Sequence, residues 1–168
     1  VRRYGFHGTS HRYVARKAAE AVNRPLEDLK IITCHLGNGS SITATENGVA
    51  VDTSMGFTPQ EGILMGTRSG SIDPTVIPYL MKRRGLTPDQ MSDLLNKKSG
   101  LLGVTGISND SRNCEEAANN GDPRAILALD ILTDGIKRYI GGYAAEMNGL
   151  DVLVFTAGIG ENSVGTRE

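Results

Sequence analysis

Glycine clusters at the ends of apolar segments are the feature of this sequence that most constrains its fold. The chain has 168 residues and 21 glycines, where average usage predicts roughly 12. They follow no Gly-X-Y period, which excludes a collagen triple helix. Gly37 and Gly39 follow an apolar segment at 31–34, and Gly158 and Gly160 follow another at 151–155. Glycine lets a backbone turn sharply or approach a ligand closely, so both clusters are expected to shape loops at strand ends.

Composition and charge exclude several classes of protein. A hydrophobic fraction of 39% is enough for a packed core, and no apolar run reaches the length of a membrane span. The net charge of −1 argues against a dedicated nucleic-acid binder. Cys34 and Cys114 lack metal-ligand spacing and are expected to be free and buried in a reducing, cytoplasmic compartment. The chain starts at Val1 without a signal peptide and stops soon after a glycine loop, so we expect a piece of a longer protein.

After a first helix, the predicted element order is three strands, a series of helices and one more strand. Asn47-Gly48 is the strongest hairpin signal in the sequence. The expected strands are 31–34, 41–45, 49–53 and a buried 151–155, and the expected helices are 10–22, 74–84, 88–98, 111–119 and 123–148.

Helix ends and loops are predicted from capping residues and glycines. Thr9 or Ser10 is expected to cap the first helix and Asp73 the second. Thr87 is expected to form a capping box with Gln90 at the start of 88–98, and Asp122 to precede the helix at 123–148. Residues 54–72 and 100–108 are expected to be loops. Ile126, Leu129, Leu132, Ile136 and Ile140 form the predicted core stripe of 123–148, and Gly141-Gly142 is interpreted as a site of close packing.

This order predicts an α/β fold with a mixed sheet, in which a three-strand meander is extended by a parallel strand behind a helix. Ligands of open α/β sheets bind outside the carboxyl ends of the strands, where both glycine clusters lie. Each cluster has two readings. Gly37-Asn38-Gly39 is either a phosphate cradle or a plain tight turn, and 158–162 is either a ligand loop or a structural strand-to-helix turn.

Three further groups are candidates for anion binding. His7 precedes a predicted helix start, where an anion would bind, whereas His11 is expected to be an exposed or half-buried helix residue. The spacing of the two histidines also allows zinc, although the Glu of a metalloprotease motif is missing. Arg68 lies in a glycine loop and is either a phosphoryl-binding side chain or a solvated one. Asp110 to Arg112 is either a plain helix cap or a frame for a ribose or base.

Five motifs in one order along the whole chain give a sharper indication than any of these groups alone. They are Tyr4 to His11, His35 to Ser40, Gly66 to Gly70, Ser108 to Arg112 and Phe155 to Asn162. Together they resemble the acetate kinase family. The resemblance implies a ribonuclease-H-like domain of the actin-like ATPase superfamily.

The resemblance also implies a reaction, namely reversible phosphoryl transfer between ATP and acetate to give acetyl phosphate and ADP. His7 and Arg68 would then be catalytic, stabilising the transferring group. The residues expected to bind nucleotide are His35, Leu36, Gly37, Asn38, Gly39, Asp110, Ser111, Arg112, Gly158, Ile159, Gly160, Glu161 and Asn162.

Parts of the family's machinery have no counterpart in the sequence. By resemblance, residues 1–27 would be an inter-domain segment and residues 28–168 most of the nucleotide-binding domain. Mg²⁺ is expected as a cofactor with its ligands mostly outside this chain, and no residue is assigned to metal here. We therefore expect the isolated chain to bind nucleotide weakly and to be inactive.

Alternatives within and beyond the family stay open. A propionate or butyrate kinase of the same family would carry the same motifs, because the acid pocket lies partly elsewhere. A non-catalytic nucleotide-binding domain would need neither His7 nor Arg68. The resemblance further implies a homodimer, with no nucleic-acid or membrane partner.

Overall fold

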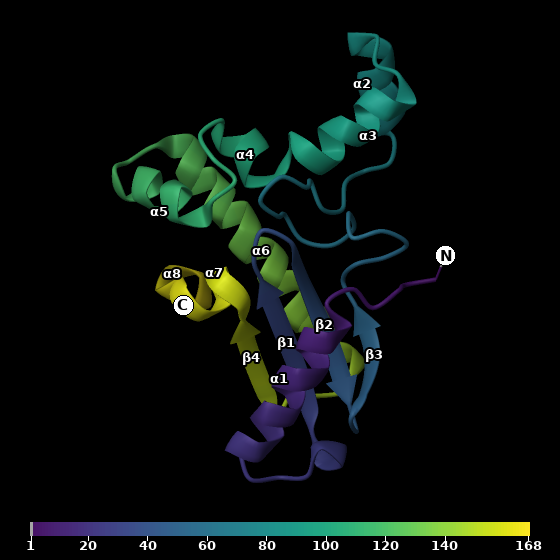
Figure 1. Cartoon of the computed structure of the whole chain (residues 1–168), viewed down its shortest axis with the longest axis vertical. Helices are drawn as coiled ribbons and strands as arrows, with labels where there is room; N and C mark the ends of the chain where they lie inside the picture. The colour runs from purple at the N-terminus through teal and green to yellow at the C-terminus, as the bar shows by residue number, and fades with distance from the viewer. Residues whose placement is uncertain (1) are drawn as a thin grey trace.

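A four-stranded mixed sheet with the strand order β3-β2-β1-β4 forms the centre of a computed structural model that describes residues 2–168 (Figure 1). Strands β1 (Lys30–Leu36), β2 (Ser40–Glu46) and β3 (Val49–Thr53) form an antiparallel meander. Strand β4 (Val152–Thr156) lies parallel to β1. The α/β class, the meander and the parallel addition predicted from the sequence are confirmed.

The side chains of β1 alternate between two helices that cover opposite faces of the sheet. Ile32, Cys34 and Leu36 pack in the main core with Leu132 and Ile136 of helix α6 (Pro123–Glu146). The alternate residues face helix α1 (Gly8–Ala21), which packs through three small alanines against Leu29 and Ile31. Figure 1 shows α1 in front of the sheet and α6 behind it. The sheet therefore has apolar contacts on both faces.

Helices α2 to α5, α7 and α8 lie at the carboxyl end of β1, and the short helix η1 lies at its amino end (Figure 1). Helices α2 and α3 form an arm at the top of Figure 1, and α7 and α8 follow β4. The bounds are η1 (Leu26–Asp28), α2 (Val76–Arg84), α3 (Pro88–Lys97), α4 (Gly100–Thr105), α5 (Ser111–Asn119), α7 (Ala157–Asn162) and α8 (Val164–Arg167). Among the residues that the structure describes, no helix combines the length and the apolar character needed to cross a membrane.

Several local predictions are confirmed. Asn47 and Gly48 both have positive φ, at 52° and 79°, as a tight type I′ hairpin requires. Thr87 forms a capping box with Gln90 at the start of α3. The Asp110 side chain caps α5, and that of Asp122 caps α6. Both cysteines are buried and free.

Two helix starts and one whole helix were predicted wrongly. Helix α1 begins at Gly8 with His7 at its N-cap position, rather than after a Thr9 or Ser10 cap. The Asp73 carboxylate accepts from Thr75 and forms a local turn, so α2 begins only at Val76. Residues 100–105 are a helix and not a loop, because the N–H groups of Leu101 and Leu102 donate to the carbonyls of Met65 and Gly66.

The ends of the strands also differ from the prediction. Strand β1 continues through His35 and Leu36, which were expected to lie in a turn. Residues 157–162 form helix α7 itself rather than a turn before a helix. Strand β4 was expected to be buried, but it is the edge strand of the described sheet and Leu153 is 37% exposed. Pairing on one side only leaves such a strand half-buried.

The predicted core stripe of α6 is partly wrong. Leu132 and Ile136 are buried, but Ile126 is 43% exposed. The first turns of α6 instead bury Ala125 and Ala128, because α4 and α5 approach the helix closely there. The close packing expected at 141–142 is also wrong, since a Cβ added at either glycine would meet no atom within 4 Å.

We expect Ile136→Ala to lower the free energy of unfolding by about 2–5 kcal/mol, because it would open a cavity in the core behind the sheet. The matched control is Ile131→Ala on the same helix. Ile131 is 40% exposed, so its truncation should cost about 1 kcal/mol or less. Urea unfolding of both variants measures the difference, and equal losses would contradict this assignment of the core.

Candidate functional site

The parallel pairing of β1 and β4 brings the two glycine clusters together. His35 pairs with Thr156 at the carboxyl ends of the strands, so the loop at 37–39 and helix α7 start side by side. A cavity of about 600 Å³ opens there. Its lining residues come from three segments and are Gly37, Asn38, Asn109, Asp110, Ser111, Arg112, Glu115, Gly158, Ile159, Asn162 and Ser163.

Asn38 joins three loops at the edge of this cavity. Its side-chain oxygen accepts a hydrogen bond of 3.0 Å from the Asn109 amide, and its backbone oxygen accepts one of 3.0 Å from the N–H of Gly66. A Cβ at Gly66 would overlap the Asn38 side chain, so glycine is needed at this close approach. These contacts fix the loop after β1 relative to the loop before α5.

Asp110 and Arg112 form an exposed ion pair at the rim of the cavity. The Asp110 carboxylate accepts from the backbone and guanidinium of Arg112, with a shortest ion-pair distance of 2.6 Å. These hydrogen bonds lower the pKa of Asp110 to about 2. The pair presents both a carboxylate and a planar guanidinium to the cavity, although its exposure limits what it contributes to stability.

Arg68 and His7 meet at Gly39, beyond the loop that lines the cavity. A Cβ at Gly39 would lie 3.1 Å from Nη1 of Arg68 and 3.7 Å from Nε2 of His7. The only carbonyl that Arg68 reaches with its guanidinium, among the described residues, is that of Pro59 at 3.4 Å. No carboxylate in the described part of the chain pairs with Arg68. Its charge is therefore available to an anion.

Three histidines gather beside Arg68. The rings of His7 and His35 stack with centroids 4.0 Å apart, and the ring of His11 lies within 6.4 Å of both. Burial lowers the pKa of His7 to about 4, with smaller contributions from His35 and Arg68. Burial likewise lowers the pKa of His11 to about 4 and also lowers that of His35. At neutral pH the rings are therefore uncharged hydrogen-bonding groups.

The prediction for His11 was wrong. Its side chain is buried at 4% exposure and lies within hydrogen-bonding distance of Thr33 and Ser41. These partners lie on β1 and β2, some 20 to 30 residues away in the sequence. Helical spacing alone could not place this face of α1 on the sheet. The polar Thr33 within an apolar strand was the available signal.

The predicted nucleotide-binding residues divide into three groups in the structure. The cavity is lined by Gly37, Asn38, Asp110, Ser111, Arg112, Gly158, Ile159 and Asn162. His35 and Gly39 instead lie beside His7. Leu36 is fully buried in the core, Gly160 packs against the backbone of Phe155 and Cys34, and Glu161 accepts a hydrogen bond from Thr156.

Three cavity residues were missed by the sequence analysis. Asn109 lines the cavity from the loop before α5, Glu115 from the middle of α5, and Ser163 from the C-cap position of α7. Asn109 lies within the motif from Ser108 to Arg112, so its position was a usable signal. Nothing in the sequence indicated that Glu115 or Ser163 would face the same space, because that depends on how α5 packs beside α7.

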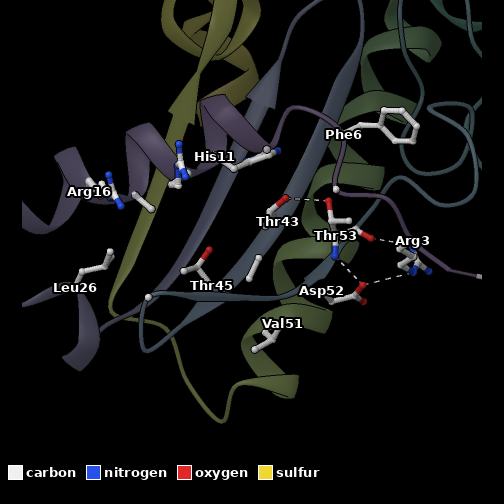
Figure 2. Close-up of a pocket in the computed structure, with 16 residues that line it drawn as sticks. Arg3, Phe6, His11, Arg16, Leu26, Thr43, Thr45, Val51, Asp52 and Thr53 are labelled. Atoms are coloured by element: carbon white, nitrogen blue, oxygen red, sulfur yellow. Dashed lines mark hydrogen bonds and ion pairs between the residues drawn. The ribbon is translucent and has the colours of Figure 1, made fainter.

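A second hollow of about 480 Å³ lies between α1 and the β2–β3 hairpin. Figure 2 shows Arg3 bridging to Asp52, and His11, Thr43 and Thr45 lining the hollow. Its lining contains neither Arg68 nor any residue of the loop at 37–39. Its cationic lining residues are Arg3, Arg12 and Arg16, and none of them belongs to a residue group predicted to bind nucleotide.

Comparisons with known proteins agree along the whole chain. The family described as the acetokinase family matches residues 1–168. The acetate kinase of Heliobacterium modesticaldum is 62% identical over 168 residues, which are all of this chain and 42% of that protein. The chain thus spans about two fifths of the length of the curated relatives that it matches.

Solved structures give the same picture. The crystal structure of Porphyromonas gingivalis acetate kinase has a TM-score of 0.97 and 55% identity, and the match covers 99% of this chain and 42% of that one. The propionate kinase from Francisella tularensis has a TM-score of 0.93 and 45% identity, covering 98% of this chain and 42% of that one.

The buried neutral His11 predicts a loss of stability in mild acid. Unfolding returns its pKa from about 4 to the ordinary value of 6.5, so the unfolded chain binds more protons and stability falls as the pH drops below 6.5. From pH 7 to pH 5 this one residue should cost about 2 kcal/mol. We expect His11→Gln to lose correspondingly less over that range in urea unfolding. Equal pH dependence in both proteins would contradict the buried neutral state.

Proposed function

The chain belongs to the acetokinase family, and from that premise we propose that it supplies the nucleotide-binding part of an enzyme that transfers a phosphoryl group reversibly between ATP and acetate. The products would be acetyl phosphate and ADP. The observation that carries this proposal is the meeting of His7 and Arg68 at Gly39, beside a cavity formed at two strand ends. A domain that only bound nucleotide would not need this pair.

The cavity supports nucleotide binding by its size and lining. Its volume of about 600 Å³ lies within the usual range of small-molecule sites, about 300–1,000 Å³. We propose that Asp110, Ser111 and Arg112 hold the adenosine from one side. Gly158, Ile159 and Asn162 would close on it from α7. A Cβ at Gly158 would meet no atom within 4 Å, so the backbone of α7 is open to a ligand there.

The loop at 37–39 runs from the cavity to the place where Arg68 and His7 meet. Gly37 and Asn38 line the cavity, and Gly39 lies next to Arg68 and His7. A phosphate chain that follows this loop would bring its terminal phosphoryl group to the two side chains. Charge spreads over the equatorial oxygens of that group in the transition state. Arg68 would neutralise the charge, and the uncharged His7 would act as a hydrogen-bonding group rather than as a second cation.

Mg²⁺ is proposed as the ion that accompanies the nucleotide phosphates. The described residues hold no group of three or more His, Cys, Asp or Glu side chains placed to bind a metal. Mg²⁺ usually keeps several waters and takes only one or two carboxylates together with substrate phosphates. We therefore assign its protein ligands mostly outside this chain and assign no step of the reaction to it here.

The organisation of the longer protein is also a proposal. Residues 28–168 would form most of the nucleotide-binding domain, and residues 1–27 would lead into it from the preceding domain. The free Cys34 and Cys114 support a reducing, cytoplasmic location. Exposed Ile126 and Leu127 on α6 support a homodimer joined through this domain. Acetate and acetyl phosphate would be the other substrates, and the isolated chain would be inactive.

Arg68→Ala in the full-length protein tests the catalytic role. We expect kcat to fall about 10²- to 10³-fold with nearly unchanged nucleotide affinity, because Arg68 would act mainly on charge that develops in the transition state. Arg138→Ala is the matched control, since that side chain is 81% exposed on α6, and it should leave turnover unchanged. Unchanged turnover in Arg68→Ala would remove Arg68 from the mechanism, and with it the observation that carries this proposal.

A propionate kinase is the second candidate, because one such enzyme is 45% identical with a TM-score of 0.93; a butyrate kinase of the family would fit the same motifs. We expect kcat/KM of the full-length protein to be highest for acetate, as the relatives at about 60% identity are acetate kinases. Assays with acetate, propionate and butyrate at fixed ATP measure the order. A higher value for either longer acid would overturn the choice of acetate.

A further inference from the structure

A hydrogen-bonded series of four side chains leads from Thr33, buried in the sheet, to His7. Nδ1 of His7 lies 2.9 Å from the Ser41 hydroxyl, which lies 2.7 Å from Nε2 of His11. Nδ1 of His11 lies 2.6 Å from the Thr33 hydroxyl. His11 lies in α1 and His7 at the N-cap of that helix, whereas Thr33 lies in β1 and Ser41 in β2. The hydrogen-bonded series therefore forms only when α1 packs on the β1–β3 meander.

The hydrogens of this hydrogen-bonded series can pair every group in two ways. Each hydroxyl and each neutral imidazole has one hydrogen that it can donate to its neighbour in the series. If the Thr33 hydroxyl donates to His11, then His11 donates to Ser41, Ser41 donates to His7, and the ring proton of His7 lies on Nε2. If every bond is reversed, the proton of His7 lies on Nδ1 and its Nε2 is bare. A third arrangement, in which both rings donate to Ser41, would leave the hydrogen of this fully buried hydroxyl without an acceptor among the described residues, because its hydrogen-bond partners are His7 and His11. With that arrangement excluded, fixing any one member fixes all of them.

The surroundings of Thr33 favour the first arrangement. In the reversed arrangement the Thr33 hydroxyl must donate to the Thr43 carbonyl, which is 3.5 Å away. That distance is beyond the usual 2.5–3.0 Å of an O–H···O hydrogen bond. Thr33 is fully buried, so a poorly bonded hydroxyl there carries a desolvation penalty. In the first arrangement the same hydrogen lies in the 2.6 Å contact with His11.

The groups around His7 keep the proton count fixed. His35 stacks on the His7 ring and lies 2.8 Å from the Ser10 hydroxyl, and the nearby Arg68 adds a positive charge that disfavours protonation of His7. Burial together with these neighbours lowers the pKa of His7 to about 4, so the ring carries a single proton at neutral pH. The far edge of the ring, with Nε2, faces Gly39.

We propose that Thr33, His11 and Ser41 are positioning residues that hold His7 in the tautomer with its proton on Nε2. This proposal rests on the proposed function in one respect, namely that Nε2–H would donate to a phosphoryl oxygen beside Arg68. A wrong tautomer would turn a bare lone pair towards that oxygen. Histidine tautomers held by a buried partner can be worth several orders of magnitude in rate.

The tautomer itself is measured on ¹⁵N-labelled protein at pH 7 by long-range ¹H–¹⁵N correlation of the histidine rings. We expect protonated Nε2 and bare Nδ1 for both His7 and His11. Protonated Nδ1 in either ring would overturn the proposal.

Removing the Thr33 hydroxyl tests whether the hydrogen bond that it donates to His11 sets the tautomer of His7. Thr33→Val keeps the shape but loses the hydroxyl, so the His7 ring should lose its single Nε2–H pattern, and Thr33→Ser should restore it. Thr45→Val is the matched control, because Thr45 is a buried residue of β2 whose hydroxyl takes no part in the hydrogen-bonded series. An unchanged His7 pattern in a folded Thr33→Val protein would overturn the proposal.

Kinetics of the full-length protein give the functional readout. Ser41→Ala should lower kcat about 10- to 100-fold while KM for ATP changes by less than about twofold. A larger change in KM than in kcat would overturn the positioning role. The ring spectra do not depend on turnover. They can therefore confirm the tautomer even if Arg68→Ala shows that the proposed function is wrong, and they can exclude it while the proposed function stands.

Discussion

The parallel pairing of β1 with β4 is the interaction on which the rest of the structure depends. It places the carboxyl ends of the two strands next to each other, and a glycine-containing segment follows each strand. Helices α1 and α6 cover the two faces and make the pairing stable by burying apolar side chains on both sides. Every group proposed to bind nucleotide is held relative to this pair of strand ends.

In this site one side chain carries the positive charge and neutral side chains provide the hydrogen bonds. Arg68 carries a charge that no carboxylate of the described chain neutralises, whereas burial keeps the three histidines beside it neutral. A second cation next to Arg68 would be costly in the absence of a ligand. Neutral imidazoles avoid that cost and still offer directional hydrogen bonds. The polar contacts of His11 under α1 show how far this arrangement reaches into the fold.

Much of the fold could be predicted from local signals. The Asn47-Gly48 turn, the capping box at Thr87 and the Asp122 cap depend only on neighbouring residues, and they occur as predicted. Helix α4 could not be predicted, because its first N–H groups are satisfied by the carbonyls of residues 65 and 66, about 36 positions earlier. The core face of α6 was misjudged for a similar reason, since alanines become buried only where other helices come close.

The sequence by itself determined the order of the four strands, the glycine-containing segments that follow β1 and β4, and the membership of a family, because the motifs that carry these are contiguous. Only the tertiary structure decided which motif residues share a space. It brought Arg68 to His7 at Gly39, placed Asp110 to Arg112 opposite α7 across one cavity, and moved Leu36 into the core. It also made His11 a buried residue with two polar partners. The physical reason is that a side chain's neighbours depend on how helices pack on the two faces of the sheet, and no local pattern encodes that packing.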